Sequence, residues 1–283
     1  MAETFNDKKH VRGRRLAYNA GIQAWYKREL KKLVRRMAKE VSNEVLRLFR
    51  SNLAKDYREQ QKQIATMDAS LASQARILMN KLKDKYTALF DDKAPFLAKE
   101  LVSRSEKQSR NSLKDSFEGL INEYTLSPNY LPAGVKEVAK STIAENVSLI
   151  TTIPEEYFKN ITGAVMRSIT TGYGVSELKN YLSKFYGQSS RKAKNVALDQ
   201  TRKAYNNINK QRMMAAGLNS FEWIHSGGGL KPRQEHIELS GKIFSFDDLP
   251  VIVPATGEKG IPGQAINCGC TMRPVYVFPE GEQ

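Results

Sequence analysis

Four side chains in the C-terminal part of the sequence have the chemistry of zinc ligands. Cys268 and Cys270, the only cysteines, stand one residue apart, and two of the three histidines, His225 and His236, precede them. Zinc takes four tetrahedral nitrogen or sulfur ligands, so these residues form a complete set if the chain folds them together. The close cysteine spacing argues against this, because zinc modules usually separate paired cysteines by two or more residues. The alternative is a metal-free core in which the cysteines pack as small apolar side chains.

The same residues allow two catalytic arrangements. His236 with Cys268 can be drawn as a thiol-protease pair, and His236 with Glu235, Asn267 and a cation as a nuclease. Neither arrangement has a local signature in this sequence, so we rank both below a non-enzymatic role. Arg233 either clamps an anion or ties down its own loop through backbone carbonyls, and we favour the second role.

The cysteine usage also indicates the compartment. A C-x-C spacing closes a strained disulfide ring, and two cysteines in 283 residues are too few for a disulfide scaffold. The sequence shows neither an N-terminal apolar run nor an apolar stretch long enough to span a bilayer. We therefore expect a protein without a transmembrane segment, made in a reducing cytoplasm.

A basic N-terminal arm carries most of the excess charge. The chain has 45 Lys and Arg against 30 Asp and Glu, a formal charge of +15. Such an excess favours non-specific binding to double-stranded DNA. Two alternative interpretations of the basic arm are a solvent-exposed helix face without a partner and a helix that lies on a membrane surface. The candidate DNA-binding residues are Lys8, Lys9, Arg12, Arg14, Arg15, Lys27, Arg28, Lys31, Lys32, Arg35 and Arg36.

Helical periodicity dominates the first three quarters of the chain. Apolar residues step by three or four within a proline-free stretch from about Arg14 to Met67, which predicts a long amphipathic helix. We expect further helices to begin at Pro95, Pro154 and Ser176, with Gly187 ending the third of them. A last helix is expected to stop at Gly217. The apolar positions of the first stripe are Leu30, Val34, Met37, Val41, Val45 and Leu48.

After Gly217 the pattern changes to short strands. "NSFEWIHS", "GKIFSF", "LPVIVP" and "CTMRPVYVF" are aromatic or β-branched runs separated by Gly, Pro and Asp. The predicted fold class is mainly α, with a long helical N-terminal region and a small α+β C-terminal module. The predicted divisions are residues 1–126, the basic helical region; 135–217, a helical segment; and 218–283, the module with short strands and loops.

An ordered set of motifs from about Met166 to Phe278 resembles the Mu F-like head morphogenesis family of tailed phages, also called minor head or minor capsid proteins. The set begins with Asp-Gln-Thr in a helix and ends with Asn-Cys-x-Cys, and Arg-x-x-His lies between them. The matching residues are Asp199, Gln200, Thr201, Gly217, Trp223, Arg233, His236, Leu239, Gly241, Lys242, Asn267, Cys268 and Cys270.

The resemblance implies a virion component that acts near the portal vertex during procapsid assembly. It implies contact with the portal protein and with scaffold or major capsid protein, and it allows contact with packaged DNA or ejection with it. Host-cell cytoplasm is then the place of assembly, and the inside of the capsid the final location. The alternative is a metal-dependent nuclease or phage-delivered effector enzyme centred on His236, Cys268 and Cys270. Zinc is the one cofactor that the residues suggest.

Overall fold

The computed structural model describes residues 10–62, 70–116, 131–171, 175–228 and 232–278, with only the helical backbone given for residues 53–62. The chain divides into two compact units. Unit 1 contains Met1–Tyr26, Ala98–Glu145 and Ala197–Gln283, and unit 2 contains Lys27–Leu97 and Asn146–Val196. Each unit therefore combines segments that lie far apart in the sequence.

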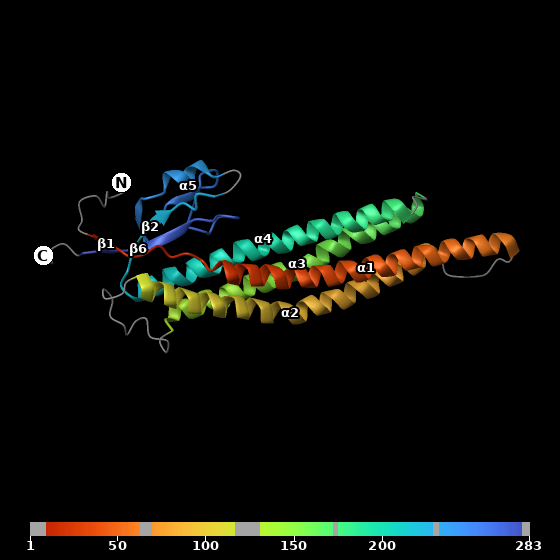
Figure 1. Cartoon of the computed structure of the whole chain (residues 1–283), viewed down its shortest axis with the longest axis horizontal. Helices are drawn as coiled ribbons and strands as arrows, with labels where there is room; N and C mark the ends of the chain where they lie inside the picture. Colours follow the sequence, from red (N-terminus) through yellow and green to blue (C-terminus); the bar gives the residue numbers. More distant parts are fainter. Residues whose placement is uncertain (1–9, 63–69, 117–130, 172–174, 229–231, 279–283) are drawn as a thin grey trace. The chain divides into compact units, whose positions relative to one another are not determined.

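Four long helices provide most of the described structure (Figure 1). They are α1 (Ala20–Lys62), α2 (Leu71–Ser116), α3 (Ala133–Thr170) and α4 (Val175–Ala215), and a short α5 (Gln234–Glu238) follows. A small antiparallel sheet lies in the C-terminal part of the chain. The predicted fold class, mainly α with a small α+β module, is confirmed. No helix among the described residues is long and apolar enough to cross a membrane.

The predicted apolar stripe of α1 forms part of the core of unit 2. Leu30, Val34, Met37 and Val41 are fully buried and Val45 is 1% exposed. Aromatic side chains of the other helices are buried with them: Tyr86 and Phe90 from α2, and Tyr157 and Phe158 from α3. Burial of this many large side chains explains why the four helices are long, because helix propensity alone does not stabilise such lengths.

Two predicted helix starts are wrong. Pro95 lies inside α2 and Pro154 inside α3, and both helices continue through them. A proline inside a helix removes one backbone hydrogen bond and costs about 3 kcal/mol. Buried residues on both sides of each proline, such as Phe90 and Leu101 around Pro95, offset that cost through packing.

The predicted break at Gly187 is also wrong, whereas the stop at Gly217 is confirmed. Gly187 lies inside α4, which runs without interruption from Val175 to Ala215. Gly217 has a φ of 77°. Its N–H donates to the Met214 carbonyl at 3.1 Å, and the Leu218 N–H donates to the Met213 carbonyl at 2.8 Å. These bonds form a Schellman motif, which requires the left-handed conformation that glycine adopts without strain.

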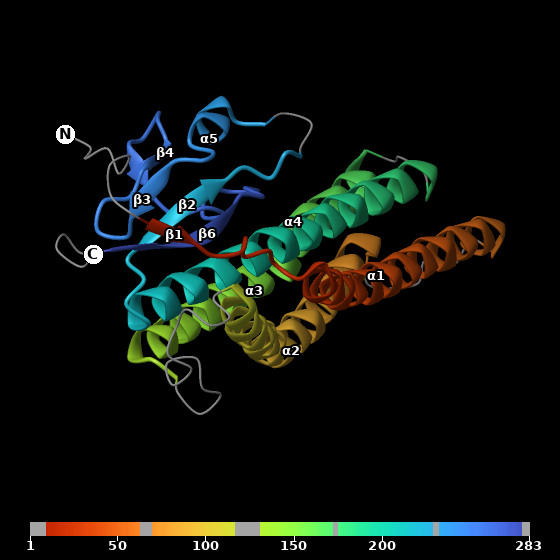
Figure 2. The same ribbon diagram turned by 60° about the vertical axis from the view of Figure 1, so that its left-hand side comes forward.

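The sheet in unit 1 has the strand order β1, β6, β2, β3, with all neighbours antiparallel (Figure 2). Its strands are β1 (His10–Arg12), β2 (Ser220–Ile224), β3 (Ile243–Ser245) and β6 (Thr271–Val277). A second sheet pairs β4 (Val251–Val253) with β5 (Glu258–Lys259). The four predicted short strands correspond to β2, β3, β4 and β6, so this part of the prediction is confirmed.

The N-terminal arm is not helical throughout, which corrects the prediction for its first residues. β1 pairs with β6 in the register His10 to Val277, and Leu16 forms a further bridge to Met272. α1 begins only at Ala20, because the Asn19 side chain accepts hydrogen bonds from the N–H groups of Gly21 at 2.7 Å and Ile22 at 3.2 Å. The N-terminal residues thus complete the sheet of the C-terminal module.

The core of unit 1 lies between this sheet and its helices. Leu16, Phe221, Trp223 and Met272 are all fully buried in one apolar cluster, and Cys268 and Cys270 belong to the same cluster. Phe221 stacks on Phe246 with ring centroids 5.0 Å apart. The two cysteines are therefore core residues of the module.

Candidate functional site

His236, Cys268 and Cys270 form a compact buried cluster in unit 1. The His236 Nδ1 atom lies 3.3 Å from the Cys268 Sγ and 3.8 Å from the Cys270 Sγ. All three potential ligand atoms lie within 4.8 Å of one another. The exposed fractions of His236, Cys268 and Cys270 are 2%, 4% and 2%. α5 supplies the histidine, and the loop before β6 supplies both cysteines.

The remaining contacts of His236 fix its ring orientation. Its Nε2 atom lies 3.0 Å from the Ile252 carbonyl oxygen. A carbonyl can only accept a hydrogen bond, so Nε2 carries a proton, and Nδ1 faces the two sulfurs. The Trp223 ring meets the His236 ring edge-on, with centroids 5.3 Å apart. This packing holds the imidazole in one orientation.

The two sulfurs share hydrogen bonds that favour one thiolate. The Cys270 thiol donates to the Cys268 sulfur, and this contact is the main cause that lowers the pKa of Cys268 and raises the pKa of Cys270. Burial opposes ionisation of both thiols. The Cys270 backbone N–H also points to the Cys268 sulfur at 3.4 Å, which further favours the Cys268 thiolate.

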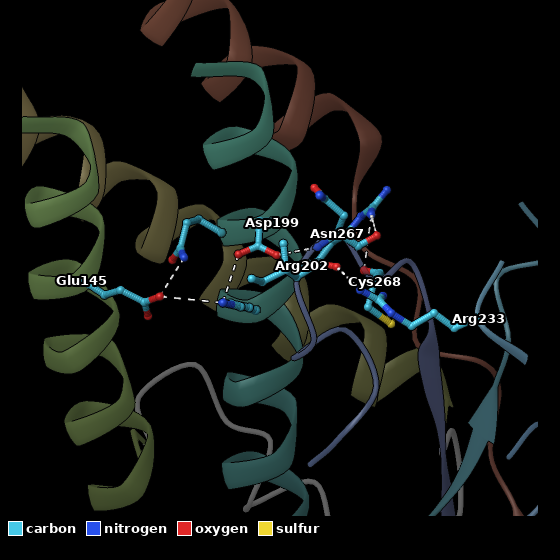
Figure 3. Close-up of polar contacts among 9 residues, drawn as sticks. Glu145, Asp199, Arg202, Arg233, Asn267 and Cys268 are labelled. Atoms are coloured by element: carbon cyan, nitrogen blue, oxygen red, sulfur yellow. Dashed lines mark hydrogen bonds and ion pairs between the residues drawn. The ribbon is translucent and has the colours of Figure 1, made fainter. Parts of the chain in front are cut away.

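The loop that carries the cysteines is fastened to α4 through its backbone (Figure 3). The Asn267 N–H donates to the Asp199 Oδ1 at 3.0 Å. Arg202 donates from one terminal nitrogen to the Asn267 carbonyl at 3.2 Å and to the Cys268 carbonyl at 3.3 Å. Asn267 has a φ of 59°, the one positive value among the described residues other than glycine. Side chains of α4 thus hold the unusual turn that places Cys268.

Further motif residues brace this arrangement. On the other side of the loop, Arg233 donates to the Ile266 carbonyl at 3.0 Å, as Figure 3 also shows. The Gly241 N–H donates to the Trp223 carbonyl at 2.8 Å and closes the turn between α5 and β3. Thr201 is buried and donates to the Ala197 carbonyl within α4.

A second layer on α4 orients Asp199. Lys203 lies 3.0 Å from the Asp199 carboxylate and 3.8 Å from Glu145 on α3. Gln200 donates to the same Glu145 carboxylate at 2.8 Å (Figure 3). The helical motif residues Asp199 and Gln200 therefore belong to one connected network with the Asn-Cys-x-Cys loop.

Sequence reasoning missed three contributors to the network: Arg202, Lys203 and Asn206. The Asn206 side chain donates to the Pro262 carbonyl at 2.9 Å and packs against Gly263, where a Cβ would lie 2.4 Å from its Nδ2. Residues three and four positions apart on a helix share one face. Counting in these steps from Asp199 leads to all three residues, so helical periodicity could have identified them as neighbours of Asp199 on the same face of the helix.

The remaining candidate residues lie elsewhere. His225 is not part of the cluster of three ligands, and its Nδ1 accepts a hydrogen bond from the Gly227 N–H at 3.2 Å. Lys8 and Lys9 lie outside the described residues. Arg12 pairs with Glu222 at 3.4 Å and Arg15 donates to Thr271 at 2.8 Å, so both contact the sheet of unit 1. Exposed Arg14 is also in unit 1, and the other candidates, Lys27, Arg28, Lys31, Lys32, Arg35 and Arg36, lie on α1 in unit 2.

The burial of the cluster limits its chemistry. A nucleophilic cysteine or a cleaving metal must reach a scissile bond, and polymer substrates need an open cleft around it. Cys268 and His236 are almost fully covered by the core of unit 1. The geometry therefore favours a structural role for the three residues over the thiol-protease and nuclease arrangements.

Comparison with known families agrees with the motif residues. Residues 159–273 match the family model described as Phage Mu protein F like protein. The matched segment includes the end of α3, all of α4, the cluster and the first residues of β6. Comparison with curated proteins and with solved structures gave no significant match. The resemblance in the sequence is thus confirmed for residues 159–273, which are similar to the Mu F-like phage proteins.

Proposed function

We propose that this protein is a minor head protein of a tailed phage that acts in procapsid assembly at the portal vertex. The Mu F-like match supports the coarse class, a phage head morphogenesis protein. The single observation that carries the proposal is the connected network around the Asn-Cys-x-Cys loop. The network joins motif residues of the matched segment, from Asp199 to Cys270, so these residues contact one another as in an intact module.

The portal protein, with scaffold or major capsid protein, is the proposed protein partner. A role at the portal vertex predicts that the chain is present in procapsids at few copies. Procapsids and virions are purified, and the amount of this chain is measured relative to portal protein by quantitative mass spectrometry. We expect the chain in procapsids in a fixed ratio to portal. Absence from both kinds of particle contradicts the proposal, and presence in procapsids but loss after DNA release indicates ejection with the DNA.

We further propose that α1 contacts the packaged double-stranded DNA. Between Lys27 and Arg50 the chain has nine basic and three acidic residues. Five of the basic residues lie exposed on one helical face: Arg28, Lys32, Arg35 and Lys39 follow at steps of three or four, and Arg50 lies eleven residues after Lys39. At 1.5 Å per residue this stripe is about 30 Å long, enough to follow several phosphates.

A hollow beside the stripe adds a basic residue from α4. Its volume is about 460 Å³, and its lining includes Arg35, Lys39 and Leu46 from α1, and Lys179 and Tyr186 from α4. All of these residues belong to unit 2. Positive side chains around an apolar floor suit a phosphate backbone, because the charges displace counterions while the floor excludes water.

Charge neutralisation at the hollow tests the DNA contact. The triple variant Arg35→Gln, Lys39→Gln, Lys179→Gln removes three positive charges. We expect weaker binding to duplex DNA of any sequence. The slope of log affinity against log salt should fall by about 0.9 for each phosphate that the protein no longer neutralises. Fluorescence anisotropy over a salt series measures both quantities.

The matched control changes the same charge elsewhere in unit 2. The variant Arg76→Gln, Lys81→Gln, Lys83→Gln neutralises three exposed basic residues of α2. If both triple variants lose affinity equally, only the net charge matters and the assignment to α1 is wrong. Unchanged binding in both variants contradicts a DNA contact by unit 2.

A further inference from the structure

We propose that His236, Cys268 and Cys270 bind one zinc ion, which cross-links α5 to the loop before β6. This inference does not depend on the proposed role in the phage head. The sequence suggests a set of four ligands that includes His225, and the structure brings three of the four together. The proposal therefore assigns the site, among the described residues, to one imidazole and two thiolates.

The distances fit a tetrahedral ion. Zinc bonds of about 2.3 Å to sulfur and about 2.0 Å to nitrogen, at tetrahedral angles, place the nitrogen about 3.5 Å from each sulfur. The observed distances from the His236 Nδ1 to the two sulfurs are 3.3 Å and 3.8 Å. The C-x-C spacing, although shorter than in most zinc modules, is thus compatible with ligation of one ion by both thiolates.

The surroundings have the features of a prepared metal site. A metal-binding histidine normally donates its other ring N–H to a carbonyl or carboxylate, and His236 has this contact with Ile252 at 3.0 Å. Hydrogen bonds from N–H groups to the sulfurs stabilise thiolates, which are the form that binds metal. The Cys270 N–H is such a donor and points to the Cys268 sulfur at 3.4 Å.

The position of the cluster explains what the ion would stabilise. His236 belongs to a helix of only five residues, and the cysteine loop has no regular secondary structure. Short, irregular segments of this kind gain most from a cross-link, because the ion binds the folded state and not the unfolded chain. Thiolate and imidazole together favour zinc over magnesium or calcium, which prefer oxygen ligands.

Metal analysis of the full chain tests the inference. The protein is purified without chelators, and its zinc content is measured by inductively coupled plasma mass spectrometry. We expect one zinc ion per chain. The content should fall to background in Cys268→Ser and in His236→Ala. His225→Ala is the matched control, because it removes a histidine outside the cluster, and it should keep the zinc.

A second measurement keeps the test decisive if the variants fail to fold. Zinc is removed from the wild-type protein with a chelator, and cobalt is added to the product. Thiolate ligation should give a charge-transfer absorption and the visible bands of tetrahedral cobalt, and thermal stability should return to its value before chelation. A folded wild-type protein that holds no zinc and gives no cobalt spectrum overturns the inference. Zinc that persists in both folded ligand variants places the ion elsewhere and overturns it as well.

Discussion

Asn267 adopts a backbone conformation that few side chains accept, and the cysteine loop depends on it. Its φ of 59° lies in the left-handed region, where asparagine is tolerated better than most residues other than glycine. The conformation directs the Asn267 N–H to Asp199 and the carbonyl to Arg202, so both backbone groups are bound by α4. Strain at one residue is thus compensated by two hydrogen bonds.

Two substitutions at this position separate backbone strain from side-chain contacts. Asn267→Ala should lower the free energy of unfolding of unit 1 by about 1 kcal/mol, because a Cβ without a compensating amide is strained in this region. Asn267→Gly removes the same side chain but accepts the conformation, so we expect little loss. Urea denaturation followed by tryptophan fluorescence measures the difference. Equal losses in the two variants contradict a role for the backbone conformation.

The sequence predicts the three residues of the cluster better than it predicts the α4 residues that hold the cysteine loop in place. Cys268, Cys270 and His236 are chemically distinctive, and the motif order of the family places them in one set. Arg202 and Asn206 escape a sequence-based search because arginine and asparagine are common on exposed helix faces. Their importance arises only when the loop around Gly263 packs against α4, a contact between residues far apart in the sequence.

At the scale of the element, α4 shows that glycine has opposite meanings at two positions. Gly187 lies within the helix, and no atom lies within 4 Å of the position that a Cβ would take. Gly217 follows the helix with a φ of 77° and is needed for the Schellman motif. The backbone conformation, and not the residue type, decides what glycine does at each position.

Alanine substitutions at the two glycines should change stability in opposite directions. Gly187→Ala should raise the free energy of unfolding by about 1 kcal/mol, since alanine has the higher helix propensity and meets no neighbour. Gly217→Ala should lower it by about 1 kcal/mol, because the left-handed conformation strains a Cβ. Thermal unfolding followed by circular dichroism compares both variants with the wild type. A stabilising Gly217→Ala would show that the helix ends differently.

Element boundaries are the least predictable feature, and the physical reason is packing. The stripe from Leu30 to Val45 is correctly predicted because its own periodicity contains the information. Pro95 and Pro154 mislead because local rules assign them to helix starts, whereas buried neighbours keep α2 and α3 continuous. β1 is not predicted because its sequence, His-Val-Arg, has one apolar residue between two basic or polar ones, whereas the equally short β3 and β4 contain apolar runs.

At the scale of the whole molecule, the first described residues are part of the C-terminal module. Leu16 is fully buried among residues such as Trp223 and Met272. Its N–H donates to the Met272 carbonyl at 2.9 Å. Deletion of the N-terminal arm therefore removes a strand and a core residue along with its charges, so point substitutions are the better test of DNA binding.

Truncation of Leu16 should destabilise unit 1. Leu16→Ala should cost about 2–5 kcal/mol, the range for buried leucines. Trp25 and Trp223, the only tryptophans, both belong to unit 1, so their fluorescence reports the unfolding of that unit.

Leu131→Ala is the control, because Leu131 lies in the same unit and is 39% exposed. If Leu16→Ala lowers the free energy of unfolding of unit 1 no more than Leu131→Ala does, the N-terminal segment does not pack against the sheet as described. In that case the fluorescence transitions of the two variants would have the same midpoint.

The pairing of β1 with β6 has a consequence for synthesis on the ribosome. Among the strands in the described residues, β1 is translated first and β6 last, and the register joins His10 to Val277. The earliest strand must wait without its partner while the four long helices are made. Pairing over such a sequence separation is slow, because the chain loses the entropy of closing a long loop before the strand contacts stabilise it. The sheet is thus completed only after β6 has left the ribosome.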